Sequence, residues 1–146
     1  MFKLKAPIST IMSDKLITVN HSDNLEIVKY VFNTYHIHHI PVLNGEELVG
    51  IISKSDFLAV SSGLGRIDRT AADEEEFLHK HTAEEVMVKG LVKLEADSRI
   101  NVAVNLFALN RFHALPVVDG KRIIGIITTH DIMVYLDKHD DEDHPQ

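Results

Sequence analysis

The sequence contains no cysteine and no tryptophan, and it has only 4 prolines and 7 glycines among its 146 residues. Without cysteine, disulfide frameworks, thiolate metal sites and thiol catalysis are excluded, and a reducing compartment is favoured. No apolar run approaches the roughly 20 residues that span a bilayer, and residues 1–12 lack the long apolar stretch of a signal peptide. We therefore expect a cytoplasmic protein that does not associate with membranes.

The chain also has little positive charge. Lysine and arginine number 15 against 22 aspartates and glutamates, which gives a net charge of −7. Residues 137–146 hold five carboxylates and one lysine and so account for −4 of that charge, which leaves −3 for the rest. Because binding to a polyanion needs clustered lysine and arginine, we expect no nucleic-acid partner.

The most informative feature is an internal repeat at a shift of 75 residues. Residues 11–58 align with residues 86–133 without a gap, and 11 of these 48 positions are identical, where average composition predicts roughly three. A period of this length is too long for a solenoid unit and predicts a duplicated small motif with two-fold pseudosymmetry. The identical pairs are Met12/Met87, Leu16/Leu91, Phe32/Phe107, His38/His113, Pro41/Pro116, Val42/Val117, Gly45/Gly120, Gly50/Gly125, Ile51/Ile126, Ile52/Ile127 and Asp56/Asp131.

Hydrophobic periodicity predicts the same order of elements in each copy, namely strand, helix, strand, strand and helix. In the first helix of each copy, apolar residues recur at the 3-4-3 spacing of an amphipathic helix. The next two strands flank Asn44-Gly45 in one copy and Asp119-Gly120 in the other, and both dipeptides favour tight hairpin turns. The predicted strands are 16–19, 40–43 and 48–52, and 91–94, 115–118 and 123–127.

Polar residues mark the expected helix starts. Ser53 and Thr128 end the last strand of each copy and are placed to cap the helix that follows, with Asp56 and Asp131 in its first turn. The segment 82–85, Thr-Ala-Glu-Glu, predicts a capping box that opens a short helix. The expected caps of the earlier helices are Ser22 or Asp23 in the first copy and Asp97 or Ser98 in the second.

These repeated segments resemble a tandem pair of CBS domains. The shared pattern is an apolar-Pro-Val strand followed at a fixed distance by Gly-apolar-apolar-Ser/Thr-x-x-Asp, which occurs at 40–56 and again at 115–131. The resemblance implies an α/β (α+β) fold of two pseudo-symmetric β-α-β-β-α motifs that bind adenosine-containing ligands in two clefts and dimerise, without catalysis. We expect motif 1 at 7–60, a linker with a polar helix at 61–81, motif 2 at 82–138, and a disordered acidic tail at 139–146.

The residues themselves also favour a nucleotide. A carboxylate such as Asp56 or Asp131 can accept hydrogen bonds from both vicinal hydroxyls of a ribose. The hydroxyls of Ser53, Ser55, Thr128 and Thr129 lie at helix N-termini, where free backbone N–H groups and the helix dipole favour a phosphate. Sugar and phosphate would then meet at one helix end.

The resemblance implies further contacts. His38 and His39 in the first copy, and His113 in the second, precede the apolar-Pro-Val strand, where family members face the phosphate. Thr18 matches a pocket threonine of the family, but Lys93 takes its place in the second copy and would either block a base or attract a longer polyphosphate. The residues expected to wall the base are Ala103 and Phe112 at the first site, and Val28 and Ile37 at the second.

Each of these residues also has a purely structural explanation. The carboxylates of Asp56 and Asp131 could serve only to stabilise their helices by interacting with the positive end of the helix dipole, which is worth about 0.3–1 kcal/mol. His38 and His113 could brace their hairpins, because they occupy the same position in both copies. A metal site at His36, His38 and His39 is a minority hypothesis, since a specific site needs further ligands and supporting hydrogen bonds.

We find no nucleophile elbow, Gly-rich phosphate loop or His-Glu-x-x-His motif, and we expect a stand-alone module that is not an enzyme and requires no cofactor. The function that these patterns favour is a cytoplasmic, energy-sensing regulatory module that binds AMP, ADP or ATP, forms a homodimer and acts on a protein target. Two alternatives remain: a scaffold that dimerises and docks a partner without a ligand, and a histidine-dependent metal sensor.

Overall fold

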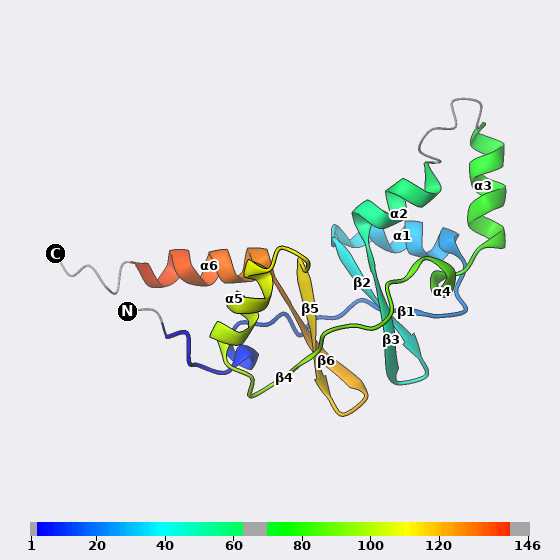
Figure 1. The fold of residues 1–146 in the computed structure, drawn as a ribbon. Coiled ribbons are helices and arrows are strands. Elements are labelled where there is room, and N and C mark those ends of the chain that lie inside the picture. Colours follow the sequence, from blue (N-terminus) through cyan, green and yellow to red (C-terminus); the bar gives the residue numbers. More distant parts are fainter. Residues whose placement is uncertain (1–2, 63–69, 141–146) are drawn as a thin grey trace. The chain divides into compact units, whose positions relative to one another are not determined.

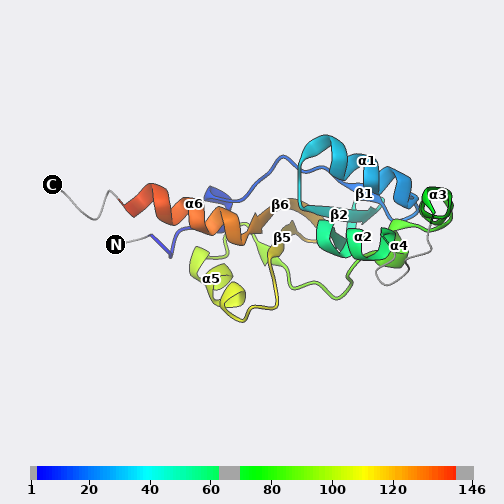
Figure 2. The same ribbon diagram turned by 90° about the horizontal axis from the view of Figure 1, so that it is seen from above.

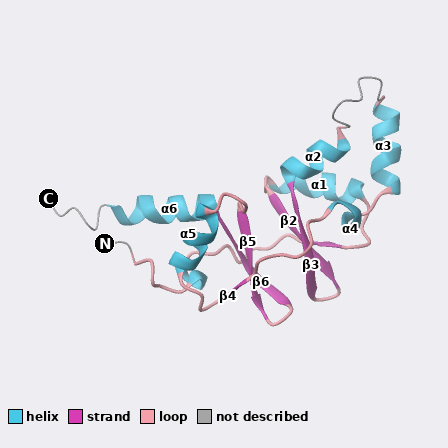
Figure 3. Ribbon diagram, in the orientation of Figure 1, coloured by secondary structure: helices cyan, strands magenta, loops and turns pink. Residues whose placement is uncertain are grey.

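The computed structural model describes residues 3–62 and 70–140. The chain divides into two compact units: a first unit, Ile17–Leu91, and a second unit that combines Met1–Leu16 with Val92–Gln146. Each unit contains one copy of the predicted strand, helix, strand, strand, helix order (Figures 1 and 3). The expected mixed α/β class is thus confirmed.

The two units are built from matching elements. The first contains β1 (Val19–Asn20), α1 (Leu25–Tyr35), β2 (His39–Asn44), β3 (Glu47–Ser53), α2 (Lys54–Ser61), α3 (Ala71–Lys80) and α4 (Ala83–Val86). The second contains a 3-10 turn (Ile8–Thr10), β4 (Leu94–Glu95), α5 (Ile100–Ala108), β5 (Ala114–Asp119), β6 (Arg122–Thr128) and α6 (Thr129–Asp140).

Strand pairing repeats residue for residue. In the first unit β1 runs parallel to β2, which pairs antiparallel with β3, and β4, β5 and β6 pair in the same way in the second. Val42 lies opposite Val19 and Gly50, and Val117 lies opposite Leu94 and Gly125. The predicted hairpin turns are present, because Gly45 and Gly120 take φ values of 63° and 62°, which glycine adopts without a side-chain clash.

Each unit has its own cluster of buried apolar residues. In the first, Val28 and Phe32 of α1 pack against strands and against Phe57 of α2, with the rings of Phe32 and Phe57 5.6 Å apart. In the second, Ile100 and Ala103 of α5 pack against Ile127 and Ile132. Phe32 is buried and Phe107 packs against its core, so both serve as core residues.

The segment that precedes each repeat folds onto the opposite repeat (Figure 1). The Ile8 N–H donates to the Ser98 carbonyl oxygen at 2.6 Å, and the matching Ala83 N–H donates to the Asp23 carbonyl oxygen at 2.8 Å. Ser13 and Val88 each form a two-way bridge, to Ile126 and to Ile51 respectively. The spatial units are therefore offset from the sequence repeats by one lead-in segment.

Two expectations about helix starts are wrong. α1 is capped by Asn24, whose side chain accepts from the Ile27 N–H, while the Asp23 carboxylate instead accepts from the Asn20 N–H in the preceding turn. α5 begins after Arg99 with no side-chain cap, because its first amides donate to the carbonyl oxygens of residues 4 and 6 in the lead-in segment. Ser98 braces the turn before α5 by accepting from the Glu95 N–H.

The expected capping box at Thr82 is also absent, since α4 starts there without a side-chain cap. A capping box is found at α3 instead. The Asp73 N–H donates to the Thr70 hydroxyl, and the Thr70 N–H donates to the Asp73 carboxylate. The sequence predicted a polar helix here, and α3 packs on α1 and α2 through buried Leu78 (Figures 1 and 2).

Parts of two expectations lie outside the described residues. Gly63 and Gly65 of the expected linker, and residues 141–146 of the expected acidic tail, are among them. The first two tail residues, His139 and Asp140, are the last residues of α6. In the described part of the chain, no helix combines the length and apolar character that crossing a membrane requires.

Candidate functional site

The first unit gathers most of its predicted site residues at the open end of the β2–β3 hairpin. His39 lies opposite Ser53 in the strand register, and the Lys54 N–H donates to the His38 carbonyl oxygen at 2.8 Å. The start of β2 and the start of α2 are thereby tied together. This bond uses only the His38 backbone, so the role of the His38 side chain stays a prediction.

Ser53 and Asp56 lie in the first turn of α2. The Ser53 hydroxyl accepts from the Asp56 N–H at 3.1 Å, so it caps the helix as predicted, and it lies 3.3 Å from the Ser55 hydroxyl. Ser55 and Asp56 are exposed. Two hydroxyls and one carboxylate therefore surround a helix N-terminus whose partial positive charge favours an anion.

The second unit repeats the strand register and the helix cap, but its aspartate is hydrogen-bonded differently. Ala114 lies opposite Thr128, and the Thr129 N–H donates to the His113 carbonyl oxygen at 3.2 Å. The Thr128 hydroxyl accepts from the Asp131 N–H at 3.2 Å, and the Asp131 carboxylate accepts from the Thr128 N–H at 2.9 Å. Asp131 thus closes a capping box, whereas the Asp56 carboxylate makes no hydrogen bond within the described residues.

The CBS domain model matches the chain twice, at residues 8–63 and 83–138. The chain belongs to the CBS domain family. Each of the two matched ranges contains one of the Ser/Thr-x-x-Asp segments described above.

Solved CBS pairs share the fold. One is the structure of CBSX2 in complex with AMP, with a TM-score of 0.75 and 19% identity, covering 92% of this chain and 98% of that one. Another is the CBS domain pair of protein MJ0100 in complex with 5'-methylthioadenosine and S-adenosyl-L-methionine, with a TM-score of 0.72 and 22% identity, covering 90% and 96%. At these identities the likeness concerns the fold.

A curated relative is inosine-5'-monophosphate dehydrogenase of Methanocaldococcus jannaschii, which is 32% identical over 120 residues. That match covers 81% of this chain but only 21% of the dehydrogenase. The chain spans about a fifth of the length of the dehydrogenases that it matches.

The remaining predicted site residues are less uniformly placed. Thr18 and Lys93 directly precede β1 and β4, whose first residues lie opposite Val42 and Val117 in the middle of the parallel strands β2 and β5. The proposed base walls are Val28 and Ala103, which are fully buried in the cores, and Ile37 and Phe112, which are half-buried. Each of these residues lies in one unit, whereas the site whose base it is expected to contact lies in the other. The contacts with the base therefore stay predictions.

His36 is set apart from the other histidines of its segment. It ends α1 in the left-handed conformation at φ 51° and is exposed, whereas His39 is half-buried in β2. Among residues 3–62 and 70–140, no three His, Asp or Glu side chains are grouped as metal ligands.

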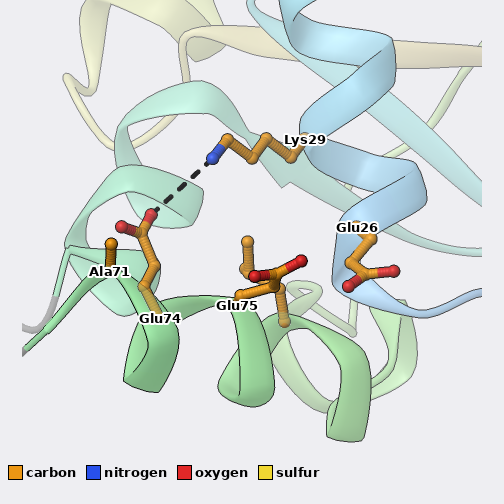
Figure 4. A pocket seen from close by; sticks show the side chains of 6 residues that line it. Glu26, Lys29, Ala71, Glu74 and Glu75 are labelled. Carbon is orange, nitrogen blue, oxygen red and sulfur yellow. Dashed lines mark ion pairs between the residues drawn. The ribbon is translucent and has the colours of Figure 1, made fainter.

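A shallow hollow between α1 and α3 lies elsewhere on the first unit (Figure 4). It is lined by Glu26, Glu74 and Glu75 together with Lys29, whose ammonium lies 3.9 Å from the Glu74 carboxylate. Since carboxylates repel phosphate, this hollow is chemically unsuited to a nucleotide, and the half-site at α2 is the better candidate.

Lys54 was missed by the sequence reasoning. It is the first residue of α2, lies between Ser53 and Ser55, and is half-buried. Its position inside the Ser-Lys-Ser-Asp segment is the signal that could have found it, because a lysine is unusual in the first turn of a helix.

Proposed function

We propose that this CBS pair is a non-catalytic, cytoplasmic regulatory module that binds an adenine nucleotide, with AMP or ADP preferred over ATP. The observation that carries this proposal is the half-site at α2, in which the hydroxyls of Ser53 and Ser55 and the Asp56 carboxylate meet at a helix N-terminus beside the start of β2. The AMP complex of CBSX2 and the S-adenosyl-L-methionine complex of MJ0100 support an adenosine ligand.

The chemistry of the half-site matches the two polar parts of a nucleotide. Backbone N–H groups at the start of α2 and the hydroxyls of Ser53 and Ser55 suit a phosphate, and the Asp56 carboxylate suits the ribose hydroxyls. A ligand that engages both would hold the β2–β3 hairpin against α2. Regulation follows only if the ligand binds one arrangement of the protein more tightly than another.

The ligand is identified by a thermal-shift screen of the apo protein against AMP, ADP, ATP, NAD, S-adenosylmethionine and Zn²⁺. A nucleotide at 100 times its dissociation constant should stabilise the protein by about 2.7 kcal/mol, which a melting curve resolves. With every ligand at the same concentration, we expect the largest shifts in melting temperature with AMP or ADP, a smaller shift with ATP and none with Zn²⁺. A flat response to all six, from protein free of co-purified nucleotide, contradicts the proposal and favours a ligand-independent scaffold.

We further propose that the chain forms a homodimer through its helices. Exposed apolar residues recur at matching positions of the two repeats, with Ile27 and Val102 42% and 41% exposed, and Leu58 and Met133 50% and 65% exposed. A second copy would remove these side chains from water. We expect light scattering at micromolar concentration to give twice the chain mass, and Leu58→Glu with Met133→Glu to give the monomer. A wild-type monomer contradicts this.

A further inference from the structure

We propose that the two half-sites are unequal, that each chain binds one nucleotide at the first unit, and that Lys54 is a further phosphate-binding residue there. This inference rests on the proposed function and deepens it. Two independent differences between the units carry it: the state of the aspartate, and the charge at the start of the helix.

The aspartates differ in their hydrogen bonds. The Asp131 carboxylate accepts from the Thr128 N–H at 2.9 Å, in a part-buried capping box. The Asp56 carboxylate is exposed and makes no hydrogen bond in the described part of the chain. Because a ribose offers two hydroxyls to two carboxylate oxygens, Asp56 is ready to accept both, whereas Asp131 must first give up or share its bond to Thr128.

The helix starts differ in charge. The first residue of α2 is Lys54, and the first residue of α6 is Thr129. A cation in the first turn opposes the helix dipole, and Lys54 is in no ion pair with any of the described residues to offset this. A residue that destabilises its own helix is expected where binding a ligand requires it. A phosphate bound at this helix end would turn the unfavourable interaction between the Lys54 charge and the helix dipole into a favourable one with the phosphate.

The second unit has a cation in a different place. Lys93 precedes β4 and is exposed, at the position that Thr18 holds in the first unit. It is not part of the segment that carries the hydroxyls and the aspartate. Lys93 is therefore the matched control for Lys54, and Asp131 is the matched control for Asp56.

The test is calorimetric titration of the full chain with AMP and, in parallel, with adenosine. We expect one AMP per chain. Lys54→Met should weaken AMP binding about tenfold, the loss of one charge-assisted contact, but leave adenosine binding unchanged. Asp56→Asn should weaken both ligands about tenfold, since it acts on the ribose. Lys93→Met and Asp131→Asn should each stay within about twofold of the wild type.

The melting temperature separates binding from folding. Lys54→Met should melt at or above the wild-type temperature, because it removes the conflict with the helix dipole, so its weaker binding is not a folding defect. Two equal sites per chain, or Lys93→Met weakening AMP as much as Lys54→Met, overturns the inequality and leaves nucleotide binding intact. Failure of the wild type to bind any adenine nucleotide overturns the proposed function together with this inference.

Discussion

Replacing Ile8 by alanine is expected to destabilise the second unit by about 2–5 kcal/mol, the usual cost of emptying a buried isoleucine site. Ile8 is 0% exposed and belongs to the core cluster of that unit, beside Ile100 and Leu115. Its backbone N–H also donates to the Ser98 carbonyl oxygen. The substitution thus acts about 90 residues away in sequence, on the repeat to which Ile8 does not belong.

Chemical denaturation measures the total loss, and hydrogen exchange followed by mass spectrometry locates it. We expect amides of α5 and β6 to lose protection before those of α1 and β3 do. Ser9→Ala is the matched control, because Ser9 is exposed in the same turn and keeps its backbone bond to the Ala96 carbonyl oxygen. A loss of protection confined to the first unit would show that the lead-in segment belongs with its own repeat.

Replacing Gly50 by alanine is expected to destabilise the protein by about 1–3 kcal/mol, the range for overpacking a core. A methyl group at Gly50 would lie 2.9 Å from Cβ of Met87. That atom has little freedom to move, because the next residue, Val88, is held by two backbone hydrogen bonds to Ile51 at 2.9 and 3.2 Å. The identity of Gly50 is thus set by the close approach of the lead-in segment.

Gly125→Ala is the matched control and is expected to cost less. A methyl group there would meet Met12 atoms beyond Cβ, first Sδ and then Cγ at 2.9 Å and Cε at 3.1 Å, and a change of rotamer can move all three. Urea denaturation of both variants gives the comparison. Met87→Ala in the Gly50→Ala background should recover only part of the loss, because it removes the Met87 Sδ and Cγ atoms, at 2.5 and 2.6 Å, but keeps Cβ. Equal costs, or no recovery, would locate the strain elsewhere.

Much of the fold could be predicted because its signals are local. Hairpin turns need glycine at positive φ, and the Asn-Gly and Asp-Gly dipeptides therefore marked both hairpins. The caps Ser53 and Thr128 were also recognisable, since a hydroxyl at the end of a strand pattern is a local cue. The caps of α1 and α5 were missed because the competing side chains bond to the preceding turn, and the lead-in carbonyls satisfy α5 from a distance.

The sequence by itself determined the duplication, the order of elements within each repeat, and the residues that meet at each helix start, because all of these depend on periodicity and short spacings. Only the tertiary structure decided which repeat each lead-in segment joins, since the two repeats offer nearly the same partners and the choice depends on long-range packing. It also decided that Asp131 closes a capping box while Asp56 does not, because identical residue types in matching positions differ only in the hydrogen bonds they make.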